Sequence, residues 1–164
     1  MKVKNLVLII CAIFFEYLRD YCFININLYI DYLENLTNGF EVFNYTDSLI
    51  LSILGDFKLK TLIIIKWILS LVFAIAFFGL GMFFSKFNFD LENHKKFLKH
   101  YTVSGLTLLF LSLIIYWTGK FLTISNEFNF YFVSLEISHL VQSSLYPISF
   151  ILIFWSYNLK ISKI

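Results

Sequence analysis

The chain has 164 residues, of which 59% are hydrophobic and 15% charged, and its formal net charge is +2. Soluble domains are about half apolar and about a quarter charged, and four long apolar runs would leave a soluble fold with helices that are apolar on every side. The composition therefore argues against a soluble domain and predicts an integral membrane protein. The lipid bilayer is then one of its expected partners. Because the basic residues are scattered, no nucleic-acid partner is indicated.

The sequence predicts an all-α integral membrane protein that forms a single domain over residues 1–164. An α-helix needs about 20 predominantly apolar residues, and at least ~17, to cross a bilayer core. Runs of that length place four transmembrane helices near residues 4–23, 60–85, 101–121 and 135–158. We expect these four spans to pack as an antiparallel bundle.

Lysine residues set the expected orientation of the spans. With four spans, the segment before the first, the segment between the second and third, and the segment after the fourth all lie on one side. These segments hold eight of the thirteen basic residues, Lys2, Lys4, Lys86, Lys95, Lys96, Lys99, Lys160 and Lys163. Because Lys and Arg favour the cytoplasmic side, we expect a multi-pass protein of the inner (cytoplasmic) membrane with both termini in the cytoplasm.

The segment between the first two spans carries helical patterns of its own. Polar side chains at helical spacing extend the first helix beyond the outer membrane surface: Glu16, Asp20, Asn27, Asp31 and Glu34. The triplet Thr37-Asn38-Gly39 predicts its end, because Gly adopts positive φ readily. Residues 47–57 mix polar and apolar positions, which predicts a short amphipathic helix on the outer interface.

The costliest side chains of the predicted bundle fall in one layer, the outer leaflet. We call them the outer polar cluster: Glu16, Arg19, Asp20, Lys66, Tyr116, Glu136, His139, Gln142 and Ser143. Ionisable groups inside a membrane face protein or water, and they are candidates for function. The cluster has three interpretations: a structural salt-bridge network, a pocket that binds or moves protons or a cationic head group, and a contact surface for a partner subunit.

Charge pairing within the first span can be expected from spacing. Arg19 lies three residues after Glu16 and next to Asp20, so it can neutralise one carboxylate locally. One acid is then left over, and Lys66 of the second span is its expected partner.

The last predicted span carries the second part of the cluster. Glu136, His139 and Ser143 share one helical face, and Pro147 cannot donate a hydrogen bond to the carbonyl of Ser143. We therefore expect the helix to bend there and to leave that oxygen free. The alternative interpretation is an interfacial His139 capped by Glu136, beside an ordinary proline kink.

No cofactor or metal is predicted. His100 and His139 lie at opposite ends of their predicted spans, ~25–30 Å apart, which is too far to hold one haem. The sequence also lacks metal-ligand spacings and nucleophile motifs. Catalysis therefore has no signature, and the sequence favours a protein without enzymatic activity.

Three features together resemble the small four-span membrane proteins that are encoded beside exosortases: Phe14-Phe15-Glu16 in the first span, the aromatic-rich outer turn, and Gln142…Pro147 in the last span. The chain departs from that pattern at the outer turn, where Ile30-Asp31-Tyr32 stands in place of Asp-Pro. The resemblance implies an accessory protein of a surface-protein sorting or export system, with no established activity.

Two functions remain open at this point. The first is a small accessory subunit or assembly factor that docks a larger membrane-protein partner through its first helix and outer loop. The alternative is a membrane-embedded enzyme or small transporter that uses Glu16 or Asp20 together with His139.

Overall fold

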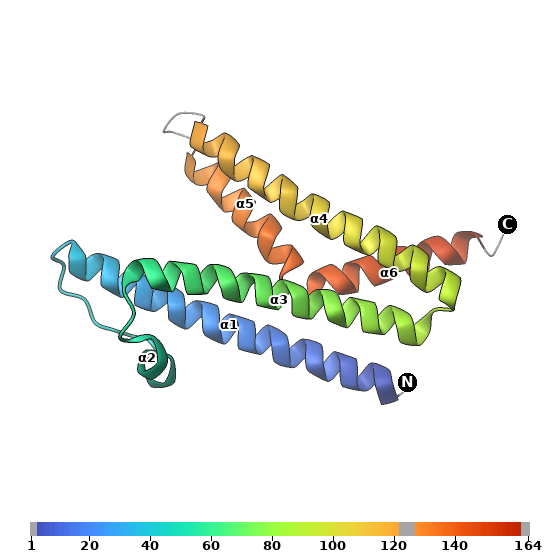
Figure 1. Cartoon of the computed structure of the whole chain (residues 1–164), viewed down its shortest axis with the longest axis horizontal. Helices are drawn as coiled ribbons and strands as arrows, with labels where there is room; N and C mark the ends of the chain where they lie inside the picture. Colours follow the sequence, from blue (N-terminus) through green and yellow to red (C-terminus); the bar gives the residue numbers. More distant parts are fainter. Residues whose placement is uncertain (1–2, 122–126, 162–164) are drawn as a thin grey trace. The chain divides into compact units, whose positions relative to one another are not determined.

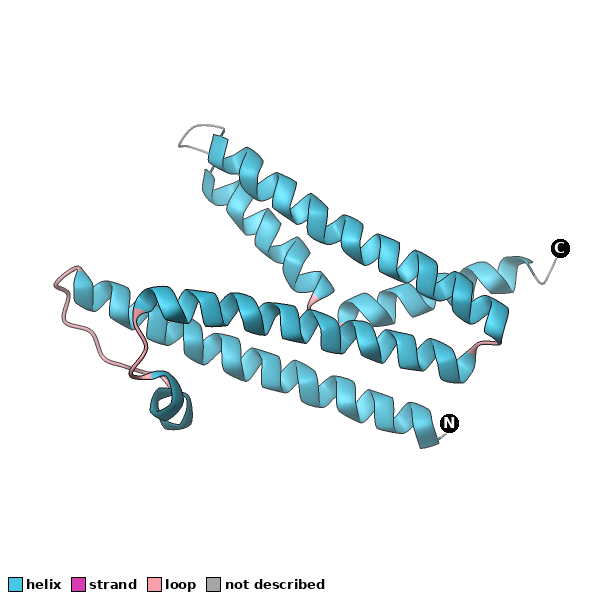
Figure 2. Cartoon of the chain, viewed as in Figure 1, coloured by secondary structure: helices cyan, strands magenta, loops and turns pink. Residues whose placement is uncertain are grey.

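The structure is a computed structural model that describes residues 3–121 and 127–161. Within these ranges the helices are joined by loops and turns, and there is no strand (Figure 2). The helices are α1 (Val3–Thr37), α2 (Ser48–Leu54), α3 (Leu59–Asn88), α4 (Leu91–Phe121), α5 (Glu127–Val141) and α6 (Leu145–Ile161). The prediction of an all-α protein is confirmed. Helices suit an apolar chain because they satisfy the backbone polar groups internally, without help from water.

Two of the described helices, α3 and α4, are long and apolar enough to cross a membrane. The pair α5 and α6 adds a third candidate if it counts as one span, and its two helices are bent by 67° relative to each other. Helix α1 does not meet the same test, because charged side chains interrupt its apolar stretch. These findings support a membrane protein, whereas four spans in an antiparallel bundle remain a prediction.

The chain divides into two compact units, and α1 and α3 each contribute to both. We call Ile13–Phe73 the loop unit, and Met1–Ala12 together with Ala74–Ile164 the main unit. Each unit has its own buried cluster of apolar side chains, and each is described by itself below.

Helix α1 runs without interruption for 35 residues, or ~52 Å, and ends where the sequence predicts. Gly39 follows with φ of 81°, and its N–H donates to the carbonyl of Leu36 at 3.2 Å. The N–H of Phe40 donates to the carbonyl of Asn35 at 3.1 Å. These bonds satisfy the last carbonyls of the helix, which explains why a glycine stands at this position.

Helix α2 lies within the segment for which a short helix is predicted, and it is fixed to α1 at both ends. Asp47 caps its first turn by accepting a bond from the N–H of Leu49 at 2.8 Å, while the N–H of Asp47 donates to the Asn25 side chain at 2.6 Å. At the other end, the Tyr29 hydroxyl donates to the carbonyl of Gly55 at 2.7 Å. The buried cluster between them consists of Ile26, Tyr29, Ile50, Leu54 and Leu62.

In the main unit, α4 and α5 pack side by side and run antiparallel (Figure 1). The Ser112 hydroxyl donates to the carbonyl of Ser134 at 2.8 Å, and the Ser134 hydroxyl donates to the carbonyl of Ser112 at 2.9 Å. Gly119 lies against Phe130, which leaves no room for a larger residue at position 119. Small residues and reciprocal hydroxyl bonds are how helices approach closely in an apolar solvent.

A buried stack of aromatic rings holds α3, α4 and α6 of the main unit together. Tyr101 is fully buried and lies between the rings of Phe78 and Tyr146, at centroid distances of 5.0 and 4.8 Å. The Tyr146 hydroxyl donates to the carbonyl of Tyr101 and lies 2.8 Å from the hydroxyl of Ser104. Both tyrosines therefore bury large apolar rings while their hydroxyl groups remain bonded.

The continuous helix that we expected over residues 135–158 is interrupted. Helix α5 ends at Val141 and α6 begins at Leu145, so the break lies before Pro147 rather than at it. Pro147 occupies the first turn of α6, where a backbone N–H has no partner within the helix and its loss costs nothing. The predicted bend is present, but its position follows from the residues that close the two helix ends.

Gly81 provides a direct test of the aromatic stack. A Cβ atom at position 81 would lie 2.6 Å from the Tyr101 hydroxyl oxygen and 2.7 Å from the Cζ atom of its ring, whereas a Cβ at Gly79 would meet nothing within 4 Å. Gly81→Ala should therefore lower the free energy of unfolding by about 1–3 kcal/mol, because the stacked ring cannot move aside. Gly79→Ala, the matched control, should be neutral or stabilising by up to ~1 kcal/mol. Equal effects in detergent unfolding experiments would contradict this packing.

Candidate functional site

The nine residues of the outer polar cluster fall into both units. The loop unit holds Glu16, Arg19, Asp20 and Lys66, and the main unit holds Tyr116, Glu136, His139, Gln142 and Ser143. The meeting of these two groups in one layer therefore remains a prediction, and the geometry of each group is described separately.

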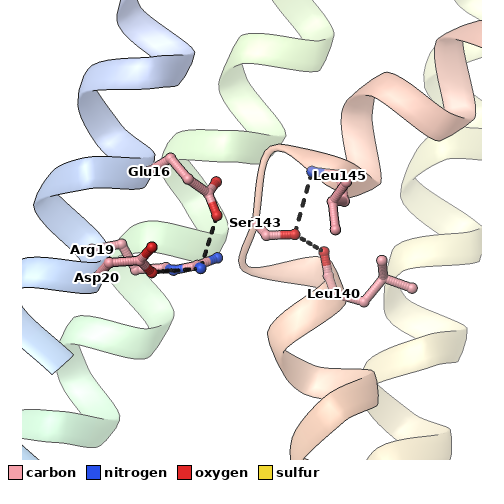
Figure 3. A network of polar contacts seen from close by, with 6 residues as sticks. All are labelled: Glu16, Arg19, Asp20, Leu140, Ser143 and Leu145. Carbon is pink, nitrogen blue, oxygen red and sulfur yellow. Dashed lines mark hydrogen bonds and ion pairs between the residues drawn. The ribbon is translucent and has the colours of Figure 1, made fainter. Parts of the chain in front are cut away.

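In the loop unit, Arg19 bonds both neighbouring carboxylates (Figure 3). Its Nη2 atom lies 2.8 Å from Oε1 of Glu16 and 2.7 Å from Oδ1 of Asp20, and its Nε donates to the same Asp20 oxygen at 3.1 Å. The predicted pairing of Arg19 with Glu16 is confirmed. The side chain of Arg19 is 17% exposed, so the fork of its guanidinium is largely covered while it bonds two acids.

Lys66 does not take the role expected of it. It forms no ion pair and no hydrogen bond with any residue that the structure describes, and it is half-buried on α3. The expectation rested on one carboxylate being left over after Arg19 had paired. Because a single guanidinium has several N–H donors, Arg19 bonds both carboxylates, and neither of them is left without a cation beside it.

The helical face expected for Glu136, His139 and Ser143 is incomplete. Glu136 and His139 lie exposed on α5, but α5 ends at Val141, so Ser143 is no longer on that helix. Gln142 and Ser143 lie in the break between α5 and α6 and are buried, at 6% and 4% exposure. This part of the outer polar cluster therefore consists of two exposed residues on α5, Glu136 and His139, and two buried residues in the helix break, Gln142 and Ser143.

Ser143 closes the two helix ends that meet at this break (Figure 3). Its hydroxyl donates to the carbonyl of Leu140 in the last turn of α5 at 2.9 Å and accepts a bond from the N–H of Leu145 in the first turn of α6 at 3.3 Å. Helix ends leave such groups without intrahelical partners, and in an apolar solvent the chain itself must bond them. The hydroxyl of Ser143 therefore has a structural role.

Tyr116 lies at a different level of the main unit. Its position follows from the antiparallel register of α4 and α5, in which Ser112 faces Ser134. Tyr116 lies four residues after Ser112 on α4, and Gln142 lies eight residues after Ser134, just beyond the end of α5. Because the two helices run antiparallel, these two steps lead in opposite directions, and their lengths add. At 1.5 Å per residue the two are separated by ~18 Å along the helix axes, so the packing of this unit does not bring Tyr116 into one layer with Gln142.

The structure also contains a polar pair that the sequence did not single out. Ser85 and His94 join α3 to α4, with Oγ of Ser85 2.8 Å from Nδ1 of His94. The Ser85 hydroxyl donates to the carbonyl of Met82 at 2.9 Å, so it accepts from the imidazole and is not activated as a nucleophile. A serine and a histidine on either side of the short Phe89–Asp90 turn could have been recognised as a pair in the sequence.

One groove of the loop unit combines acidic and aromatic side chains. Two exposed acids, Asp31 and Glu41, line it together with Tyr32, Phe43 and Tyr45, and we call it the acidic groove. Neither acid forms an ion pair within residues 3–121 or 127–161. No group of three or more His, Cys, Asp or Glu residues in the described chain is arranged to hold a metal ion.

Comparison of the chain with protein-family models, with curated proteins and with solved structures finds no match. The resemblance to exosortase-associated proteins therefore remains a prediction.

Arg19 offers the clearest test of the site. Arg19→Gln should destabilise the protein by about 1–2 kcal/mol, because Glu16, which is 28% exposed, and Asp20, which is 53% exposed, would lose the guanidinium that bonds both of them. Neutralising all three groups, as Glu16→Gln/Arg19→Gln/Asp20→Asn, should recover most of that loss. Unfolding of the detergent-solubilised protein measures both effects.

The matched control is the exposed pair of Lys96 and Glu92, whose side chains are 59% and 75% exposed. Lys96→Gln should change stability by no more than about 0.5 kcal/mol. If Arg19→Gln were as mild as this control, the proposed role of Arg19 would be wrong.

Proposed function

We propose that the protein is a small polytopic membrane accessory subunit or assembly factor that docks a larger membrane complex through the loop unit. One observation carries the proposal, namely that five large apolar side chains stand exposed in the segment of the chain that joins α1 to α3. The exposed fractions are 62% for Phe40, 82% for Phe43, 77% for Tyr45, 58% for Leu49 and 61% for Ile53. We call these five residues the docking row.

Two members of the docking row, Leu49 and Ile53, lie on α2, which contacts with α1 hold in place. Asn25 and Tyr29 of α1 bond the two ends of α2, and Ile50 and Leu54 of α2 are buried while Leu49 and Ile53 remain exposed. An apolar surface that is ordered before binding loses less conformational entropy when a partner covers it. Exposed aromatic anchors on such a support are typical of protein interfaces.

The acidic groove supports the proposal and indicates the chemistry of the partner. Asp31 and Glu41 supply two negative charges beside the rings of Tyr32, Phe43 and Tyr45. A Lys or Arg side chain of the partner would find both carboxylate acceptors and aromatic faces there. The partner surface that this groove fits therefore carries a basic side chain among apolar ones. A complex of the sorting or export type, as the resemblance implies, is the setting that we favour.

The alternative is an enzyme or transporter that uses Glu16, Asp20 and His139. Arg19 already bonds both acids of α1, and Ser143 is used in closing the helix break. These contacts favour a structural use of the outer polar cluster over a chemical one.

The proposal is tested by photo-crosslinking in intact membranes. A benzophenone amino acid at Phe43 should form an adduct of one defined mass with a single partner protein. The same probe at Leu106, which is 62% exposed on α4, is the matched control and should label lipid. Asp31→Asn/Glu41→Gln should weaken the Phe43 adduct by a factor of about 13, as expected for the loss of charge-assisted bonds worth about 1.5 kcal/mol. Glu34→Gln, which changes an exposed acid of α1 outside the groove, should leave the adduct unchanged.

Two outcomes would contradict the proposal. The first is that the probe at Phe43 labels only lipid, as the probe at Leu106 does. The second is that Glu16→Gln or His139→Ala abolishes a transport or catalytic activity while the partner adduct forms normally.

A further inference from the structure

A second charged surface lies in the main unit, where α1 begins and α3 ends. Asn5 and Asn88 exchange two side-chain hydrogen bonds of 2.8 and 2.9 Å, which fix the first turn of α1 beside the last turn of α3. One residue before each asparagine stand Lys4 and Phe87, and Nζ of Lys4 lies 5.1 Å from the centre of the Phe87 ring. The two helix ends are thus joined by a polar pair and a cation–π contact.

These helix ends form an open groove with an excess of positive charge. Val3, Lys4, Lys86 and Phe87 line it, and its volume is about 530 Å³. Within the described chain neither lysine forms an ion pair, whereas Lys96 nearby in the sequence is paired with Glu92 at 2.6 Å. Since one water molecule takes up about 30 Å³ of liquid, the groove has room for a phosphate group and several waters.

An apolar strip leads away from this groove along both helices. On α1, Val3, Val7 and Ile10 lie at helical spacing and are 77%, 51% and 57% exposed. On α3, Phe83 is 45% exposed and stacks on Phe87 at a centroid distance of 6.3 Å. This arrangement is complementary to a phospholipid. The two cations at one end can contact the charged head group, and the exposed apolar strip can contact the acyl chains that follow it.

We propose that this groove binds the phosphate group of an anionic phospholipid, with its acyl chain along the apolar strip. Lys4 and Lys86 supply the positive charge, and the Asn5–Asn88 pair holds them on neighbouring helix ends. Both lysines lie where a long apolar stretch begins or ends, which is the depth at which lipid phosphates are found. The site is independent of the docking row, since it belongs to the other unit.

The purified full-length chain in detergent, titrated with phosphatidylglycerol and followed by native mass spectrometry, tests this site. The protein should bind phosphatidylglycerol in preference to zwitterionic phosphatidylcholine. Lys4→Gln/Lys86→Gln should lower the affinity for phosphatidylglycerol about 30-fold, or roughly fivefold for each lysine near an anionic lipid. Lys4→Arg/Lys86→Arg should retain the affinity, because the charge is kept.

The matched control is Lys95→Gln/Lys99→Gln, which removes two exposed lysines of α4 without altering the groove. This variant should bind phosphatidylglycerol within about twofold of the unmodified chain. An equal loss in both double variants would show general charge attraction and would overturn the proposal, as would unchanged binding in Lys4→Gln/Lys86→Gln. Displacement of the lipid by inorganic phosphate would also overturn it, because the site would then recognise a free anion.

Discussion

An apolar solvent offers no hydrogen bonds, so backbone polar groups that lie in it must be satisfied by another part of the chain. The backbone meets this constraint by forming helices wherever it crosses apolar stretches. Side chains meet it with bonds between helices, as in the reciprocal pair of Ser112 and Ser134. Where a helix must break, the hydroxyl of Ser143 bonds both exposed ends. The same constraint explains why Arg19 bonds two carboxylates within a few residues on α1.

Several residues of the outer polar cluster form contacts that hold the fold together. Ionisable groups in an apolar stretch are candidates for function, but here several are already used by the fold. The surfaces that remain available lie at the ends of the helices. One is the docking row with its acidic groove, and the other is the groove of Lys4 and Lys86. The two proposed surfaces, one for a partner protein and one for a lipid, are consistent with the proposed accessory subunit.

Local patterns predicted much of the fold, whereas contacts between helices could not be predicted in the same way. The length of α1, its end at Gly39 and the helix that follows Asp47 all follow from spacing, capping and positive φ. The stack of Tyr101 and Tyr146 depends on contacts among three helices, which no local pattern records. Pro147 indicated a bend, but its ring only removes a donor, and Ser143 determines where the helix ends meet. Lys66 was expected to pair because the sequence could not show how many acids one guanidinium bonds.

The central prediction is that α1 crosses the membrane although its apolar stretch carries Glu16, Arg19 and Asp20, which Arg19 links by ion pairs. Cysteine accessibility tests it most directly, in a chain where Cys11 and Cys22 are replaced by alanine and a single cysteine is placed at Val3 or at Phe40, on either side of the apolar stretch. An impermeant maleimide added to intact cells should label Phe40→Cys and should reach Val3→Cys only after the membrane is permeabilised. Labelling of both positions from the same side would contradict the account.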